Sequence, residues 1–259
     1  MLLAIDIGNT NIVAGVFAGD ALVAHWRMAT DARRMPDEYA VLLDSLFRLG
    51  DLKTSGIRGA IVCSVVPSVQ ETLCVALQMH WGLDPLIVSL DLDLGVEICY
   101  EPREAVGADR IANAVATLHR YGAPAIVVDF GTATTLDAIS RDGVYVGGSI
   151  APGLKVSEEA LYRHTARLPR APLEAPRAAV GKSTTTSLQS GILYGYAALV
   201  DGLVERFRDE LGQEAHVIAT GGLADAVVPH TRTVARTDPD LTLLGLHLLY
   251  LRNGRQRHG

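Results

Sequence analysis

The sequence predicts an α/β protein made of two similarly folded domains, and three observations carry this prediction. The chain has 259 residues, enough for one large domain or two modest ones. Short runs rich in Ile and Val alternate with longer segments of helical period. A strand–turn–strand pattern around an acidic residue occurs twice, about half a chain apart, and such a repeat indicates two related domains. The expected domains are residues 1–121 and 122–259.

The first domain is expected to begin with a three-stranded meander and to continue with alternating helices and strands. Gly19 and Asp20 form a hairpin signal between the second and third strands. Pro67 suits the opening of a helix, because its fixed φ and missing N–H are tolerated there. The expected strands are residues 2–6, 12–17, 21–26, 59–66 and 87–90, and the expected helices are residues 37–49, 67–77 and 108–121.

The second domain is expected to start as the first one does. Residues 125–131 copy residues 2–8: an apolar strand, an Asp, an apolar residue and a Gly. A strand over 135–140 and the turn at Asp142 and Gly143 follow in matching positions. The remaining expected elements are a loop over 168–176, a helix over 187–207, a strand from 215 that ends in Gly221 and Gly222, and a helix over 241–251.

Composition excludes several classes of function. The formal net charge is −6 and no basic run is visible, which argues against a protein that binds nucleic acid or an anionic membrane. The three cysteines, Cys63, Cys74 and Cys99, have no metal-ligand spacing and indicate free thiols in a reducing compartment. Neither a signal peptide nor an apolar run of roughly 20 residues is found. We expect a cytoplasmic protein without nucleic-acid or membrane partners.

The stretch AVGKSTTTSLQSG, residues 179–191, is similar to a phosphate-binding loop but lacks its context. Such a loop needs a Gly five positions before the Gly-Lys pair and a strand in front. Pro176 stands at that position, after a segment rich in Pro and Arg. Residues 183–187 instead supply the hydroxyl groups of a helix N-terminus. Lys182 is therefore not expected to bind a triphosphate.

The repeated acidic turns are better candidates for a phosphate site. Gly8 and Gly131 each follow a strand-end Asp by two residues and let backbone N–H groups approach an oxyanion closely. Phosphate repels a bare carboxylate, so Asp6 and Asp129 require intervening cations. Mg²⁺ takes one or two carboxylates together with water and phosphate oxygens. Two ordinary hairpin turns are the alternative, and the matching positions favour function.

Five segments in this order resemble the type III pantothenate kinase family of the actin-like kinase superfamily. They are AIDIGNTN at 4–11, GADRIANAVA at 107–116, DFGTATTLD at 129–137, GGSIAPGL at 147–154 and ATGGLA at 219–224. The resemblance implies two ribonuclease-H-like domains, with mixed sheets flanked by helices and an active site in the cleft between them. It also implies a homodimer that phosphorylates pantothenate to 4'-phosphopantothenate with ATP and Mg²⁺, the first step of coenzyme A biosynthesis.

The same resemblance implies a role for each matching residue. Asp109 would accept the proton of the pantothenate hydroxyl, and Arg110 would hold the pantothenate carboxylate. Asp6 would hold Mg²⁺ through water, whereas Asp129 would bind K⁺ or ammonium. The implied phosphate contacts are Asp6, Ile7, Gly8, Asn9, Thr10, Asn11, Ile12, Val13 and Thr132. The implied substrate contacts are Tyr100, Gly107, Ala108, Asp109, Arg110 and Thr184.

Other interpretations of these residues and of the chain stay open. Asp109 could be a helix N-cap, Tyr100 a packing residue, and the Gly147-Gly148 and Gly221-Gly222 pairs either adenosine contacts or plain turns. The dimer interface is expected on the helix over 187–207, with Leu188, Ile192, Leu199 and Leu203. Alternative functions are another small-molecule kinase of the superfamily, or a non-catalytic regulator of the Bvg accessory factor type. Retention of Asp6, Asp109 and Asp129 together favours the kinase.

Overall fold

The computed structural model of the protein describes residues 1–165 and 168–254, which form two compact units. Unit 1 contains residues 1–95, residues 101–116 and the segment that begins at Leu241. Unit 2 contains residues 96–100 and 117–240. These bounds differ from the division predicted at residues 121 and 122, chiefly because helix α8 (Leu241–Asn253) belongs to unit 1.

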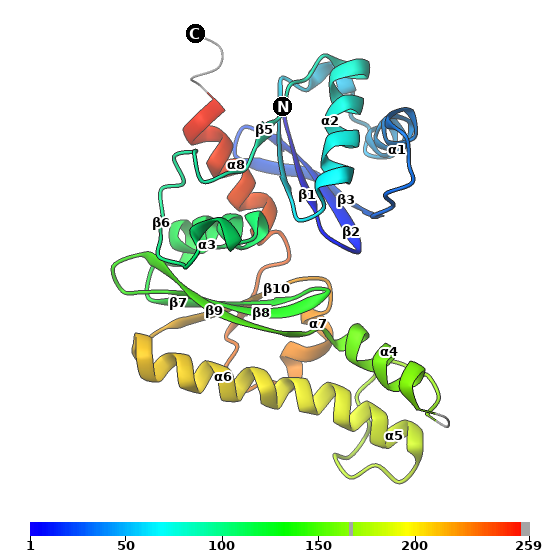
Figure 1. The fold of residues 1–259 in the computed structure, drawn as a ribbon, viewed down its shortest axis with the longest axis vertical. Coiled ribbons are helices and arrows are strands. Elements are labelled where there is room, and N and C mark those ends of the chain that lie inside the picture. The colour runs from blue at the N-terminus through cyan, green and yellow to red at the C-terminus, as the bar shows by residue number, and fades with distance from the viewer. Residues whose placement is uncertain (166–167, 255–259) are drawn as a thin grey trace. The chain divides into compact units, whose positions relative to one another are not determined.

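Unit 1 is built on a five-stranded mixed sheet (Figure 1). Its order is β3-β2-β1-β4-β5, in which β1 pairs antiparallel with β2 and parallel with β4. The strands are β1 (Leu2–Ile7), β2 (Asn11–Ala18), β3 (Ala21–Ala29), β4 (Gly59–Ser64) and β5 (Leu86–Ile87). The helices are α1 (Pro36–Leu49), α2 (Pro67–Trp81) and α8, and α3 (Ala108–Tyr121) contributes residues 108–116.

The two faces of this sheet are covered by different helices. Leu3, Ile5 and Ile7 of β1 join the buried side chains of α1 and α2 in one apolar core. Alternate residues of a strand point to opposite faces, so Leu2, Ala4 and Asp6 face the other way. On that second face, Leu243 of α8 packs against Gly15, the strand partner of Ala4. Asp6 therefore lies on the face that carries α8.

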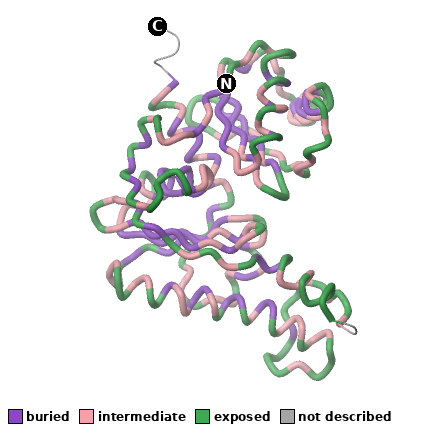
Figure 2. The backbone as a smooth tube through the Cα atoms, in the orientation of Figure 1, coloured by how far each residue is buried: buried purple, intermediate pink, exposed green. Residues whose placement is uncertain are grey.

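Unit 2 contains a six-stranded mixed sheet of order β11-β10-β7-β8-β9-β6. The strands are β6 (Glu97–Ile98), β7 (Ala125–Phe130), β8 (Ala133–Ile139), β9 (Val144–Pro152), β10 (His216–Thr220) and β11 (Arg236–Thr237). The other elements are α4 (Leu154–His164), α5 (Thr184–Gln189), a π-helical turn (Ser190–Tyr194), α6 (Gly195–Leu211) and α7 (Ala224–Val227). Figure 2 shows the central strands of both sheets as buried segments.

The predicted repeat is confirmed by the strand topology. In each unit an antiparallel meander of three strands is extended by a parallel strand beside the first one: β3-β2-β1-β4 in unit 1 and β9-β8-β7-β10 in unit 2. The α/β class with mixed sheets flanked by helices is therefore confirmed. Strand β9 and helix α4 were not expected, and the predicted helix over 187–207 is α5, the π-helical turn and α6 in succession.

Three of the four apolar residues expected at a dimer interface contribute to the core of unit 2. Ile192 is buried in the core that α6 forms with β7 and β8, and Leu199 and Leu203 pack against that core. The π-helical turn places the neighbouring residues Ile192 and Leu193 both inward. Among the described helices, none is long and apolar enough to cross a membrane.

Candidate active site

The first acidic turn is a tight connection between β1 and β2. The amide of Gly8 donates to the carbonyl of Asn11 over 3.0 Å, and a Cβ on Gly8 would lie 3.1 Å from that oxygen. The hydroxyl of Thr30 in turn donates to the carbonyl of Gly8 over 2.7 Å. Asn9, Thr10 and Asn11 are exposed. The turn thus presents polar groups at the surface from a backbone that is fixed at both ends, whereas Ile12 is buried and Ile7 lies in the core.

Asp6, Asp109 and Cys63 form a cluster in unit 1. Burial and the nearby Asp109 carboxylate raise the pKa of Asp6 to about 7, while the hydrogen bond from Cys63 works against this shift. The thiol of Cys63 donates to Oδ1 of Asp6 over 3.1 Å. Burial and the same two carboxylates raise the pKa of that thiol well above its usual range. The two carboxylates repel each other, and a cation placed beside them would relieve that repulsion.

The donor set fits Mg²⁺ bound largely through water and phosphate. Within the described ranges, no three His, Cys, Asp or Glu side chains gather as a metal centre. A Mg²⁺ ion keeps several waters and uses one or two carboxylates beside phosphate oxygens. Asp6, which lies at the start of the first acidic turn, can supply such a carboxylate and hold the ion through a bound water.

Asp109 lies within the first turn of α3 rather than before it. Helix α3 begins at Ala108, and Oδ1 of Asp109 accepts the amide of Arg110 over 2.8 Å. A Cβ on Gly107 would collide with the same Oδ1, so a side chain there would displace this carboxylate. Asp109 is half-buried and Arg110 is only 7% exposed. The motif therefore orients one carboxylate and buries one guanidinium at the start of a helix.

The second acidic turn, in unit 2, is enclosed by glycines. A Cβ on Gly221, whose φ is +92°, would collide with Oδ1 of Asp129 and lie 2.6 Å from the amide nitrogen of Phe130. The amide of Gly153 donates to the carbonyl of Thr132 over 3.1 Å, and a Cβ on Gly153 would collide with that oxygen. Thr132 itself is exposed. The backbone at Gly221 thus lies directly against Asp129, and the backbone at Gly153 lies directly against Thr132.

Tyr100 and Thr184, the two predicted substrate contacts in unit 2, lie in different settings. The ring of Tyr100 lies 6.2 Å from that of Tyr145, and a Cβ on Gly147 would be 3.6 Å from it. Tyr145 is held in turn by Asp137, whose Oδ1 accepts its hydroxyl over 2.7 Å. Thr184 is the exposed first residue of α5. Tyr100 therefore packs beside Tyr145, a contact that the motif alone did not reveal.

The helix N-terminus predicted at residues 183–187 is confirmed. Ser183 is the N-cap of α5, and its hydroxyl accepts the amide of Thr186 over 3.2 Å. The described residues between α4 and α5 contain no strand, so Gly181 and Lys182 lack the setting of a phosphate-binding loop. Lys182 is exposed beside this cap.

Sequence reasoning missed Cys63, Thr30 and Gly153. The signal for Cys63 lies in the strand register, because Asp6 and Cys63 are Cα partners in the parallel pair of β1 and β4. Gly153 is the next-to-last residue of the segment GGSIAPGL, which the sequence indicates only as a family motif. These contacts depend on which strand positions face each other, and a single sequence does not fix that register.

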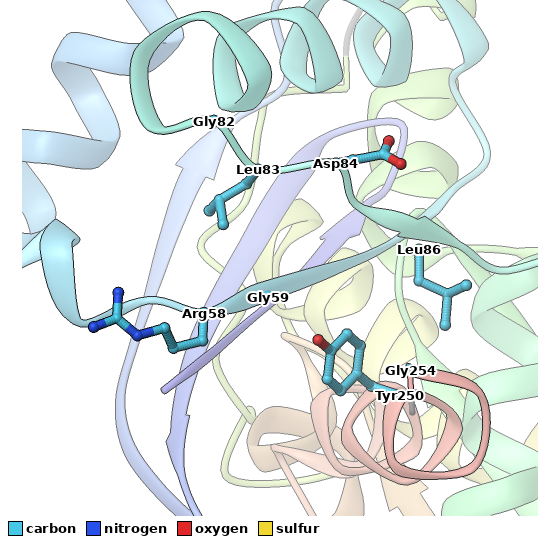
Figure 3. A pocket seen from close by; sticks show the side chains of 8 residues that line it. All are labelled: Arg58, Gly59, Gly82, Leu83, Asp84, Leu86, Tyr250 and Gly254. Carbon is cyan, nitrogen blue, oxygen red and sulfur yellow. The ribbon is translucent and has the colours of Figure 1, made fainter. Parts of the chain in front are cut away.

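A pocket of about 260 Å³ lies away from these residues (Figure 3). Its lining includes Arg58, Gly59, Leu83 and Tyr250, and Gly59 pairs with Leu2 at the start of β1. Asp6 stands four residues further along β1, about 13 Å away at the usual rise of a strand. The pocket is therefore distinct from the acidic cluster.

The chain is similar to proteins of one family along nearly all of its length. A family model described as type III pantothenate kinase matches residues 2–206. A type III pantothenate kinase from Moorella thermoacetica is 46% identical over 98% of this chain and 100% of its own length. Another from Thermomicrobium roseum is 49% identical over 98% of both chains.

Solved structures of lower identity have the same fold. A protein from Campylobacter jejuni described as a Baf family transcriptional activator has a TM-score of 0.64 at 19% identity, covering 98% of this chain and 99% of its own. A 2-dehydro-3-deoxygalactonokinase from Sinorhizobium meliloti has a TM-score of 0.57 at 13% identity, covering 96% and 95%. At these identities the likeness shows the fold alone, and the predicted α/β fold with mixed sheets flanked by helices is confirmed.

Proposed function

Because this chain belongs to the type III pantothenate kinase family, we propose that it transfers the γ-phosphoryl group of ATP to the primary hydroxyl of pantothenate. The product is 4'-phosphopantothenate, in the first step of coenzyme A biosynthesis. The observation that supports the chemistry best is the proximity of Asp6 and Asp109, close enough that one carboxylate raises the pKa of the other. Phosphoryl transfer needs a cation site beside a proton acceptor.

The turn from Asp6 to Val13 binds the phosphates of ATP. Its backbone is closed by the Gly8–Asn11 hydrogen bond and tied to Thr30, so the exposed amide and hydroxyl groups of residues 9–11 are held in place. Such preorganised donors stabilise charge on the transferred group without rearranging during the reaction. When bound, Mg²⁺ neutralises part of the phosphate charge, and Asp6 holds it through water.

Asp109 accepts the proton of the pantothenate hydroxyl. Its carboxylate receives one backbone hydrogen bond, from Arg110, and an ionised carboxylate has roughly four acceptor positions. Further positions therefore remain for a substrate hydroxyl. The absence of a side chain at Gly107 leaves room for this carboxylate at the helix start.

Arg110, Tyr100 and Thr184 bind the acceptor. The guanidinium of Arg110 is the group suited to a carboxylate, because its planar fork forms two parallel hydrogen bonds. Its burial strengthens such a pair. Tyr100, which packs beside Tyr145, offers an apolar wall with a hydroxyl, and Thr184 offers an exposed hydroxyl.

Asp129 binds K⁺ or ammonium next to the second phosphate turn, where Thr132 donates to ATP. The close approach of Gly221 brings backbone groups beside this carboxylate. We expect activity in buffers that contain K⁺ or ammonium and its loss in a sodium-only buffer. A coupled assay at constant ionic strength measures this, and full activity in sodium alone would contradict the role of Asp129.

The enzyme works as a cytoplasmic homodimer. Unit 2 exposes apolar side chains on β9 and α4, namely Ile150 at 64%, Val156 and Tyr162 at 45% each and Leu161 at 39%. An interface would bury them, whereas the apolar residues of α6 are used in the core. Sedimentation velocity should find a dimer that Ile150→Glu weakens, and a wild-type monomer at micromolar concentration would contradict this proposal.

A coupled assay of ADP formation tests the function directly. Purified protein with ATP, Mg²⁺ and K⁺ is offered pantothenate, simple sugars or acetate in parallel. We expect turnover with pantothenate alone. Turnover with a sugar or acetate but not with pantothenate would assign the chain another acceptor.

A further inference from the structure

We propose that Cys63 is a positioning residue for Asp6. Its thiol holds one oxygen of the Asp6 carboxylate, so that the second oxygen keeps a fixed direction for the water bound to Mg²⁺. This inference rests on the function proposed above for Asp6. Neither the family resemblance nor the motifs assign any role to Cys63, which the sequence presents only as a free thiol.

The strand register places the two side chains together. Strands β1 and β4 run parallel with Asp6 and Cys63 as Cα partners, so both side chains project from the same face of the sheet. Sγ lies 3.1 Å from Oδ1 of Asp6, a short contact for sulfur and oxygen. The pair sits near the end of both strands, directly before the phosphate turn.

The chemistry of the contact fixes its direction. An ionised carboxylate only accepts hydrogen bonds, whereas a thiol can donate one. Cys63 has no exposed surface, so water does not compete for its S–H. Oδ1 is therefore held by a donor that is built into the sheet and does not depend on solvent.

A held carboxylate matters at this position. The last torsion of an Asp side chain is broad, so an unheld carboxylate group rotates easily. The neighbouring Asp109 adds like-charge repulsion that would push it away. A site that binds a cation through water needs its carboxylate held within a fraction of an ångström, and a second residue must supply that restraint.

Two substitutions distinguish a positioning role of Cys63 from a packing role, because the two roles predict opposite orders of activity for the variants. Cys63→Val keeps an apolar side chain in the buried site but has no donor. Cys63→Ser keeps a donor but is smaller and more polar. If Cys63 only fills space, the Val variant should work and the Ser variant should fail. If it positions Asp6, the Ser variant should retain activity despite a lower Tm, and the Val variant should lose activity despite a Tm near wild type.

The decisive readout is the Mg²⁺ dependence. For Cys63→Val we expect kcat to fall about tenfold and the Mg²⁺ concentration for half-maximal activity to rise severalfold, the scale of one hydrogen bond to a charged group. For Cys63→Ser we expect both values within about threefold of wild type. Cys74→Val, at a half-buried cysteine of α2, is the matched control and should change neither.

Binding measurements keep this test separate from the proposed function. Titration calorimetry of ADP with and without Mg²⁺ needs no acceptor, so it reports on Cys63 even if pantothenate is not the substrate. We expect Cys63→Val to weaken ADP binding in Mg²⁺ and to leave Mg²⁺-free binding unchanged. A Val variant that matches wild type in Mg²⁺ dependence, or a Ser variant as impaired as Val, would overturn the proposal.

Discussion

The two acidic turns share one strand topology but have different surroundings. In unit 1, Asp6 has a second carboxylate nearby and a thiol that donates to it. In unit 2, the backbone at Gly221 lies against Asp129. The amide of Gly153 donates a hydrogen bond to the carbonyl of Thr132 in the turn. The two turns thus sit in similar frames of strands, and the elements packed beside each frame decide its surroundings. Unit 1 gathers two carboxylates and a thiol beside its turn, whereas unit 2 brings backbone close to its turn.

The largest expected effect is in unit 1, from Asp109→Asn. The variant keeps the shape of the side chain but removes the proposed proton acceptor, so we expect kcat to fall by about 10²–10⁴. Steady-state kinetics with pantothenate measure this, and circular dichroism checks that the fold is kept. Asp225→Asn, at an exposed position of α7, is the control. Unchanged turnover of Asp109→Asn would exclude Asp109 as the base.

The next effect is in unit 2, from Gly221→Ala. Gly221 has a φ of +92°, and the new Cβ would lie 2.6 Å from the amide nitrogen of Phe130. We expect a loss of about 2–4 kcal/mol in the free energy of unfolding, combining backbone strain with overpacking.

Urea denaturation measures this loss, with Gly191→Ala as the matched control. A Cβ on Gly191 would have no neighbour within 4 Å, and its φ is ordinary. That variant should be neutral or slightly more stable. Equal stability of both variants would show that the close approach to Asp129 is not needed.

A smaller effect concerns the pH dependence that Asp6 gives to unit 1. Its pKa is raised from 3.8 to about 7, so the folded protein keeps a proton that the unfolded chain loses above about pH 4. The free energy of unfolding without Mg²⁺ or nucleotide should therefore fall from pH 4 to 7 and stay low above it. Asp6→Asn should flatten this decline and stabilise the protein at pH 8 by on the order of 2 kcal/mol, allowing for partial exposure.

Asp31→Asn is the control for that measurement. Arg33 holds the pKa of Asp31 down, at about 2, so its contribution is present above pH 4 and is lost only as the pH falls toward 2. The free energy of unfolding, measured with urea, should thus change between pH 5 and pH 8 by the same amount in Asp31→Asn as in wild type. A wild-type protein that gains stability between these two values would contradict the raised pKa of Asp6.

The smallest effect is expected from Lys182→Ala. Lys182 is exposed beside the N-cap of α5 and lies in neither acidic turn. We expect kcat and the KM for ATP within about twofold of wild type, as is usual for surface substitutions away from a site. A large rise in the KM for ATP would indicate that this segment binds the triphosphate.

The repeated motif predicted much of the fold, because each copy carries its own local signals. The strand, Asp and Gly pattern located both acidic turns, and the hydroxyl-rich segment at 183–187 located a helix start. Other features depend on tertiary packing. Helix α8 joins unit 1 because Leu243 fits against Gly15, a long-range contact without a local signature. Strand β9 was missed because Gly147, Gly148 and Pro152 interrupt its strand pattern.

The same contrast between local sequence signals and tertiary packing applies to the predicted site residues. Motif order named Asp6, Asp109, Asp129 and Thr132, but it could not show that Asp109 raises the pKa of Asp6 or that Tyr145 packs beside Tyr100. Cys63 had no motif at all, and only the parallel register of β1 and β4 brings it to Asp6.

Transfer of a phosphoryl group to pantothenate is followed most directly by ³¹P NMR of the reaction. With ATP, pantothenate, Mg²⁺ and K⁺, the account predicts one new phosphomonoester signal that grows in step with ADP. Asp109→Asn should slow its appearance by about 10²–10⁴. ADP that forms with inorganic phosphate and without a phosphomonoester would contradict the account.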